Sequence, residues 1–135
     1  MPRHIRYQGA IVQEDAILLI RHQHHADERT YWVIPGGGIE DGETPEACIA
    51  REMKEETNLD VEIGRLLGVY SDPKRDPRFH TASVVFIVKA HGEPKGGDDA
   101  KTAKLYALDE IPMEQLVFDH GAILKDYLLQ RSTES

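Results

Sequence analysis

The sequence is poor in cysteine, in long apolar stretches and in positive charge, and each shortage excludes a class of protein. Cys48 is the only cysteine among 135 residues, so an intrachain disulfide is excluded and a reducing compartment is favoured. The longest apolar runs, AILLI and ASVVFIV, have the length of strands and are far too short to span a membrane. The N-terminal MPRHIRYQGAIV has no extended apolar core typical of signal peptides. We therefore expect a soluble, cytoplasmic protein without a membrane partner.

Acidic residues outnumber basic ones, and this balance restricts the partners. The chain has 24 Asp and Glu against 16 Lys and Arg, a formal net charge of −8. A general nucleic-acid binder usually carries a basic face, so we expect no nucleic-acid partner. A small molecule bearing phosphates would be repelled unless a local positive charge, such as a bound divalent cation, reversed the field.

The length and the pattern predict one α/β domain over residues 1–135, with helices covering a sheet. Apolar segments bounded by turn residues predict strands at 6–13, 16–21, 31–34, 61–70, 80–90 and 103–108. A helix should begin at the N-cap Thr44, followed by Pro45, and end at Asn58. We expect a second helix at 120–130, a helical turn at 113–118, and a glycine-rich turn at 35–43.

Three glutamates crowd the C-terminal end of the first predicted helix. Glu52, Glu55 and Glu56 are spaced i, i+3 and i+4, so they project from one side. Like charges at this spacing cost about 0.2–0.5 kcal/mol per pair, and the helix dipole is already negative there. Two interpretations follow: a solvated acidic face, or a site for a hard cation such as Mg²⁺ or Mn²⁺.

The surrounding spacing favours the second interpretation. The stretch GGIEDGETPEACIAREMKEETNL, from Gly37 to Leu59, resembles the Nudix box: Gly, five residues, Glu, seven residues, Arg-Glu, an aliphatic, any residue, Glu-Glu, any residue, Gly, an aliphatic. The matching residues are Gly37, Glu43, Arg51, Glu52, Met53, Glu55, Glu56 and Leu59. Asn58 replaces the family's second glycine, and asparagine also tolerates the left-handed conformation at a helix end.

The resemblance implies an α/β/α sandwich around a mixed sheet and the hydrolysis of a nucleoside diphosphate linked to another group. It implies that Mg²⁺, with Mn²⁺ as a substitute, is held by the glutamates Glu52, Glu55 and Glu56 and by a backbone carbonyl in the Gly36–Gly37 turn. Glu43 and Arg51 would orient the glutamates through a salt bridge.

The resemblance leaves the general base open. In the family it comes from the box or from a later loop. Asp98 and Asp99 occupy the region of such a loop, and we favour Asp99. The alternative is a polar turn with two solvated aspartates.

A later segment bears on the substrate. SDPKRDPRFHTAS, residues 71–83, is similar to the ADP-ribose pyrophosphatase branch, which typically reads SDPxRDPRGH; Phe79 stands where that branch has glycine. Arg75, Arg78 and His80 are therefore predicted to contact phosphate or ribose, since arginine binds phosphate oxygens in a bidentate fork. The alternative is that Asp76 and Arg78 brace a rigid proline loop.

Three further features are open to a functional interpretation. Arg21 ends a predicted strand and could point to the same substrate site as Arg75, Arg78 and His80. Trp32 either stacks on a base or anchors the core beside Val33 and Ile34. The histidines of HQHH, residues 22–25, are interpreted as an exposed loop because three close histidines make poor tetrahedral zinc geometry.

The leading hypothesis is an Mg²⁺-dependent ADP-ribose pyrophosphatase that releases AMP and ribose 5-phosphate. Its rival is a nucleoside-triphosphate pyrophosphohydrolase that sanitises the nucleotide pool. A catalytically silent nucleotide sensor is disfavoured because every box glutamate is present. The resemblance also implies a homodimer.

Overall fold

The computed structural model describes residues 4–13, 16–23, 30–76, 80–92, 103–116 and 119–133. The strands are β1 His4–Gln13, β2 Ala16–Gln23, β3 Thr30–Val33, β4 Gly36–Gly38, β5 Asp60–Tyr70, β6 Thr81–His91 and β7 Ala103–Ala107. The helices are α1 Pro45–Thr57, the short 3₁₀ helix η1 Met113–Gln115, and α2 His120–Thr133. The two predicted helices and the helical turn are therefore confirmed within these residues.

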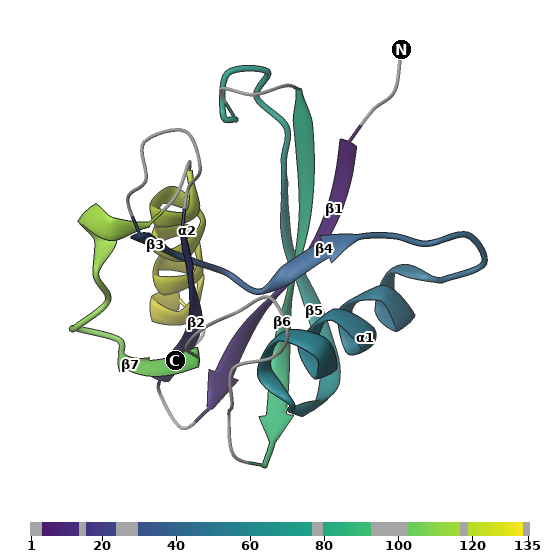
Figure 1. The fold of residues 1–135 in the computed structure, drawn as a ribbon. Coiled ribbons are helices and arrows are strands. Elements are labelled where there is room, and N and C mark those ends of the chain that lie inside the picture. Colours follow the sequence, from purple (N-terminus) through teal and green to yellow (C-terminus); the bar gives the residue numbers. More distant parts are fainter. Residues whose placement is uncertain are drawn as a thin grey trace.

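Within the described residues, the strands form one mixed sheet. Its main order is β3-β2-β1-β6-β5, with β4 paired to β1 and β7 paired to β2. Strands β1 and β6 run parallel, whereas every other pairing is antiparallel. Figure 1 shows α1 and α2 on different sides of these strands. The α/β class with a mixed sheet is confirmed.

Two apolar cores occupy the two faces of the sheet. Adjacent residues of β2 belong to different cores, because successive side chains of a strand point to opposite faces. Leu18 packs with Ile49 and Met53 of α1. Its neighbours Ile17 and Leu19 pack in the other core, where α2 contributes the residues Ile123, Leu124 and Tyr127. The predicted sandwich is present, and each helix is held by its own core.

Local signals fix α1 at both ends. The Thr44 hydroxyl oxygen accepts a hydrogen bond from the Ala47 N–H at 3.1 Å, and Pro45 follows at the first helical position. Asn58 adopts φ 62°, and its N–H bonds to the carbonyl of Lys54. The left-handed cap predicted for Asn58 is confirmed, so the missing family glycine leaves the end of the helix intact.

The prediction of a turn beginning at residue 35 was wrong in one respect. Gly36–Gly38 is the short strand β4, with Gly36 opposite Gln8 and Gly37 opposite Tyr7 of β1. A Cβ on Gly36 would lie 2.5 Å from the Gln8 side chain and 2.6 Å from the Tyr7 carbonyl oxygen. Glycine is required there because β4 packs directly on β1.

No helix in the described part of the chain is long and apolar enough to cross a membrane.

Candidate functional site

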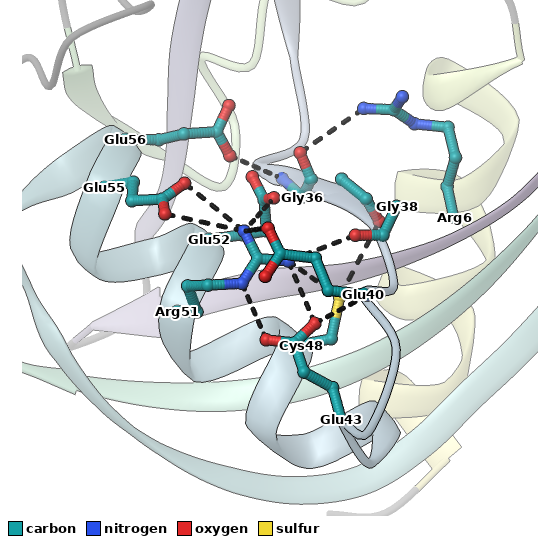
Figure 2. Close-up of polar contacts among 11 residues, drawn as sticks. Arg6, Gly36, Gly38, Glu40, Glu43, Cys48, Arg51, Glu52, Glu55 and Glu56 are labelled. Atoms are coloured by element: carbon teal, nitrogen blue, oxygen red, sulfur yellow. Dashed lines mark hydrogen bonds and ion pairs between the residues drawn. The ribbon is translucent and has the colours of Figure 1, made fainter.

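The three glutamates predicted to bind metal lie together where α1 faces β4. Glu56 is buried, and its Oε1 accepts a 2.9 Å hydrogen bond from the Gly36 N–H. Glu52 is partly buried, whereas Glu55 is exposed. Figure 2 shows the carboxylates of Glu52 and Glu56 directed toward the β4 backbone. The packing of a helix against a glycine strand thus brings the acids beside main-chain groups.

Arg51 is the counter-ion of this acidic group (Figure 2). Its guanidinium forms a fork on Glu43, with Nε donating to Oε2 at 2.6 Å and Nη2 to Oε1 at 3.0 Å. Nη1 donates to Glu52 at 2.7 Å and to Glu55 at 3.4 Å. Nη2 also donates to the Gly38 carbonyl at 3.1 Å. The predicted Glu43–Arg51 salt bridge is present, and it fixes Arg51 against β4.

These contacts have opposite effects on two carboxyls. The hydrogen bonds from Arg51 lower the pKa of Glu43 to about 2, so Glu43 stays ionised. Burial raises the pKa of Glu52, despite the bond from Arg51, and the charge of Glu56 adds to the effect. A nearby cation would favour the ionised form of Glu52. The local electrostatics therefore favour a positive ion beside Glu52.

Gly37 is the tightest point of the site. A Cβ at this position would lie 2.4 Å from the Cδ atom of Glu52. At the adjacent Gly38, a Cβ would meet nothing within 4 Å. Glycine is therefore needed at position 37 so that the Glu52 carboxylate can lie against the backbone of β4.

Cys48 of α1 lies next to β4 and contributes no nucleophile. Its Sγ is 3.9 Å from the Gly37 carbonyl oxygen, and the residue is buried. Burial raises the pKa of the Cys48 thiol to about 11, so the thiol stays protonated at neutral pH. Since the thiolate is the reactive form, cysteine-based chemistry is excluded at this site.

The donor set fits a hard divalent cation. Glu52, Glu55 and Glu56 supply carboxylate oxygens, and β4 supplies carbonyl oxygens, which are the ligands that Mg²⁺ and Mn²⁺ prefer. Within the described residues, no three acidic, histidine or cysteine side chains form a ready-made metal site. Arg51 donates to Glu52 and Glu55, so a bound cation would compete with Arg51 for these oxygens.

Arg75 was predicted to contact the substrate, but in the structure its guanidinium is bound by other residues of the protein. Its side chain is 3 % exposed. Nε and Nη2 donate to the two carboxylate oxygens of Asp119 at 2.8 and 2.7 Å, and Nη1 donates to the Thr81 hydroxyl at 2.9 Å. All three nitrogens are thus engaged within the protein. Arg75 ties the segment after β5 to β6 and to the start of α2.

The other residues predicted to contact the substrate lie in different environments. His80 is exposed, and its Nε2 lies 3.1 Å from the Ser71 carbonyl oxygen, so it closes the loop while staying accessible. Trp32 is 8 % exposed and meets Tyr106 edge to face, which favours the core-anchor alternative. The backbone of Arg21 pairs with Trp32, and its side chain lies outside the description. Arg78 and Asp99, together with Asp98, also lie outside the described residues.

Sequence reasoning missed two polar residues that contact the backbone of residues 34–36. Arg6 of β1 donates from Nη2 to the Gly36 carbonyl at 3.3 Å. His120 is buried at the start of α2, and its Nδ1 accepts a 3.1 Å hydrogen bond from the Ile34 N–H. Burial lowers the pKa of His120 to about 3, so the imidazole stays neutral and can accept this bond. A charged residue inside a central strand was the available signal for Arg6.

The chain is similar in sequence to known proteins. The family model described as the NUDIX domain matches residues 3–127. The ADP-ribose pyrophosphatase of Methanocaldococcus jannaschii is 45% identical over 125 residues, which cover 92% of this chain and 72% of that protein.

Two solved structures have the same fold. A MutT Nudix hydrolase from Burkholderia pseudomallei gives a TM-score of 0.80 at 27% identity, covering 93% of this chain and 98% of the other. A bifunctional NMN adenylyltransferase/ADP-ribose pyrophosphatase from Francisella tularensis, complexed with AMP and a Mn ion, gives a TM-score of 0.78 at 25% identity. That match covers 96% of this chain but only 42% of the Francisella chain.

Proposed function

Since this chain belongs to the Nudix family, we propose that it is a pyrophosphohydrolase that converts ADP-ribose to AMP and ribose 5-phosphate. The family follows from the NUDIX match over residues 3–127. The observation that carries the substrate is the 45% identity to an ADP-ribose pyrophosphatase over 92% of the chain. The loop segment at 71–83, with its resemblance to the same branch, supports it independently of the box.

The box residues divide the work in a way that their contacts support. Glu52, Glu55 and Glu56 would hold the cation, with Mg²⁺ proposed and Mn²⁺ as a substitute, and the Gly37 carbonyl would complete the set. When bound, the cation supplies charge stabilisation to the pyrophosphate and lowers the pKa of water. In the hydrolysis, water would attack a phosphorus atom and the pyrophosphate phosphorus–oxygen bond would break, while a carboxylate within hydrogen-bond reach would take the proton of the attacking water.

Arg51 and Glu43 act as positioning residues. The fork from Arg51 to Glu43 anchors the guanidinium, which then holds Glu52 through its 2.7 Å bond. Because the hydrogen bonds from Arg51 lower the pKa of Glu43 to about 2, Glu43 is ionised at neutral pH and this anchor persists there. Arg51 also balances the negative charge of the site before the cation arrives. Asp99 remains our candidate for a general base from the later loop.

Product analysis tests the substrate assignment. We expect the wild type with Mg²⁺ to convert ADP-ribose to AMP and ribose 5-phosphate, and chromatography of the reaction mixture separates these products. A parallel reaction with dGTP covers the rival function, a nucleoside-triphosphate pyrophosphohydrolase. Cleavage of dGTP alone would replace the ADP-ribose assignment by a triphosphate pyrophosphohydrolase. Cytoplasmic location, a single domain over 1–135, the absence of a nucleic-acid partner and a homodimer stay predictions.

A pair of glycine substitutions tests the geometry at the cation site. Gly37→Ala should lower kcat about 10–100-fold, since the new Cβ displaces the Glu52 carboxylate, which lies 2.4 Å from its position. Stability should change little because the clash is with the mobile end of a side chain. Gly38→Ala is the matched control, with open space around its Cβ. Equal activity of the two variants would show that the position of Glu52 does not matter.

A further inference from the structure

Arg6 lies beside an acidic site, yet it has no acidic partner within the described part of the chain. Its Nη2 donates to the Gly36 carbonyl at 3.3 Å, which is a long hydrogen bond. Among the described residues, no carboxylate forms an ion pair with Arg6. Figure 2 shows its guanidinium approaching Gly36 from the side away from α1. In a chain of net charge −8, a half-buried cation with one weak contact is poorly explained by stability alone.

Gln8 supplies a second, independent observation on the same face of β1. The residue is 2 % exposed, and its Nε2 donates to the Ile34 carbonyl at 3.0 Å. Its Oε1 is buried and has no hydrogen-bond partner among the residues that the structure describes. Buried acceptors are nearly always satisfied in folded proteins, so an orphaned one marks a position where a ligand group can supply the donor. Since Arg6 and Gln8 are two residues apart in a strand, both side chains point the same way.

Gly36 links this pair to the glutamates. Its N–H donates to Glu56 while its carbonyl accepts from Arg6, so the backbone of a single residue separates the two charged side chains. From backbone dimensions, the bonded carboxylate oxygen of Glu56 and the guanidinium nitrogen of Arg6 are no more than about 10 Å apart. Gln8 packs against the same glycine, because a Cβ there would lie 2.5 Å from its Cγ. One anionic molecule can therefore reach both sides of Gly36.

We propose that Arg6 and Gln8 form a substrate subsite on β1, in which Arg6 binds a phosphate oxygen and Gln8 accepts a hydrogen bond from a hydroxyl or amino group of the nucleoside diphosphate. This inference rests on the proposed function. The glutamates with their cation would hold the pyrophosphate from one side, and Arg6 neutralises the oxygens on the other. Arginine suits this role because its planar fork presents several donors to one phosphate. Arg6 exchanges its weak bond to Gly36 for the phosphate, which opens the space beside Gly36 next to Gln8.

Binding of inorganic pyrophosphate tests the Arg6 half without any turnover. Calorimetric titration with Mg²⁺ present should give about tenfold weaker binding for Arg6→Gln than for the wild type. Arg6→Lys should recover part of the affinity, because it restores the charge without the fork. Arg65→Gln on β5, where the exposed Arg65 bonds to the Gln130 side chain, removes the same charge from another strand and should leave binding unchanged. Equal pyrophosphate affinity of Arg6→Gln and the wild type overturns the role of Arg6.

Kinetics with ADP-ribose test the Gln8 half. Gln8→Met should raise KM about fivefold while kcat and pyrophosphate binding stay near the wild-type values, since the lost contact is to a donor that pyrophosphate lacks. Gln8→Asn, which keeps the amide but withdraws the acceptor, should raise KM similarly and serves if the methionine variant unfolds. An unchanged KM in the folded variants overturns the role of Gln8. If the wild type does not cleave ADP-ribose, the proposed function fails, yet the pyrophosphate titration still decides on Arg6.

Discussion

Replacement of Glu56 by glutamine should leave the protein folded but lower kcat on the order of a thousand-fold. The fold should survive because the glutamine Oε1 can still accept the 2.9 Å hydrogen bond from the Gly36 N–H. The negative charge is lost, and with it a strong oxygen ligand for the cation. Since Glu56 is buried against β4, no other described carboxylate can take its place without moving the helix end.

Steady-state hydrolysis of ADP-ribose and thermal unfolding, measured on the same preparations, check this expectation. Glu46→Gln is the matched control: it makes the same change in the first turn of α1, where Glu46 is exposed. It should keep wild-type activity. An additional readout is Mg²⁺ titration, in which Glu56→Gln should require a higher concentration to reach its own maximum rate. Activity of Glu56→Gln above a tenth of the wild type would remove Glu56 from the catalytic machinery.

The helix that carries these acids could be predicted because its signals are local. Thr44, Pro45 and Asn58 each act on neighbouring backbone, and the structure places all three at the expected caps. The strand β4 could not be predicted in the same way. Gly36–Gly38 has no strand propensity of its own, and its conformation is imposed by pairing with β1, which is distant in sequence. Contacts between remote segments override local preference here.

The same difference between local and distant contacts decides which site residues could be predicted. The ion pair between Glu43 and Arg51 joins two positions of one motif, so spacing was enough to predict it. Arg75 was predicted to contact the substrate because arginine binds phosphate well. Its partner Asp119 lies 44 residues away in the sequence, so no local pattern indicates this ion pair. Arg6 was missed for the same reason, since its importance comes from β4 lying beside it. Residue chemistry identifies candidates, whereas tertiary contacts decide which donors remain available.

Removal of the Asp119 carboxylate should destabilise the protein by about 3 kcal/mol, because it leaves the buried guanidinium of Arg75 without its partner. The side chain of Arg75 is 3 % exposed, so water cannot replace the two lost bonds, and its remaining described side-chain contact is the Thr81 hydroxyl. For a domain of this size, we expect Asp119→Ala to lower Tm by about 10 °C. The cause is an uncompensated buried charge, and the value of the salt bridge itself is smaller.

Denaturant unfolding of three variants separates these two contributions. Asp126→Ala on α2 removes an exposed carboxylate that accepts a hydrogen bond from the Tyr70 hydroxyl, so it should cost at most about 1 kcal/mol. The double variant Arg75→Met with Asp119→Ala should recover part of the stability lost in Asp119→Ala, because an apolar side chain replaces the stranded charge. If Asp119→Ala costs no more than Asp126→Ala, the guanidinium of Arg75 is not the brace between β6 and α2. In that case the prediction that Arg75 contacts the substrate phosphates would stand again, since its donors could leave Asp119 without a loss of stability.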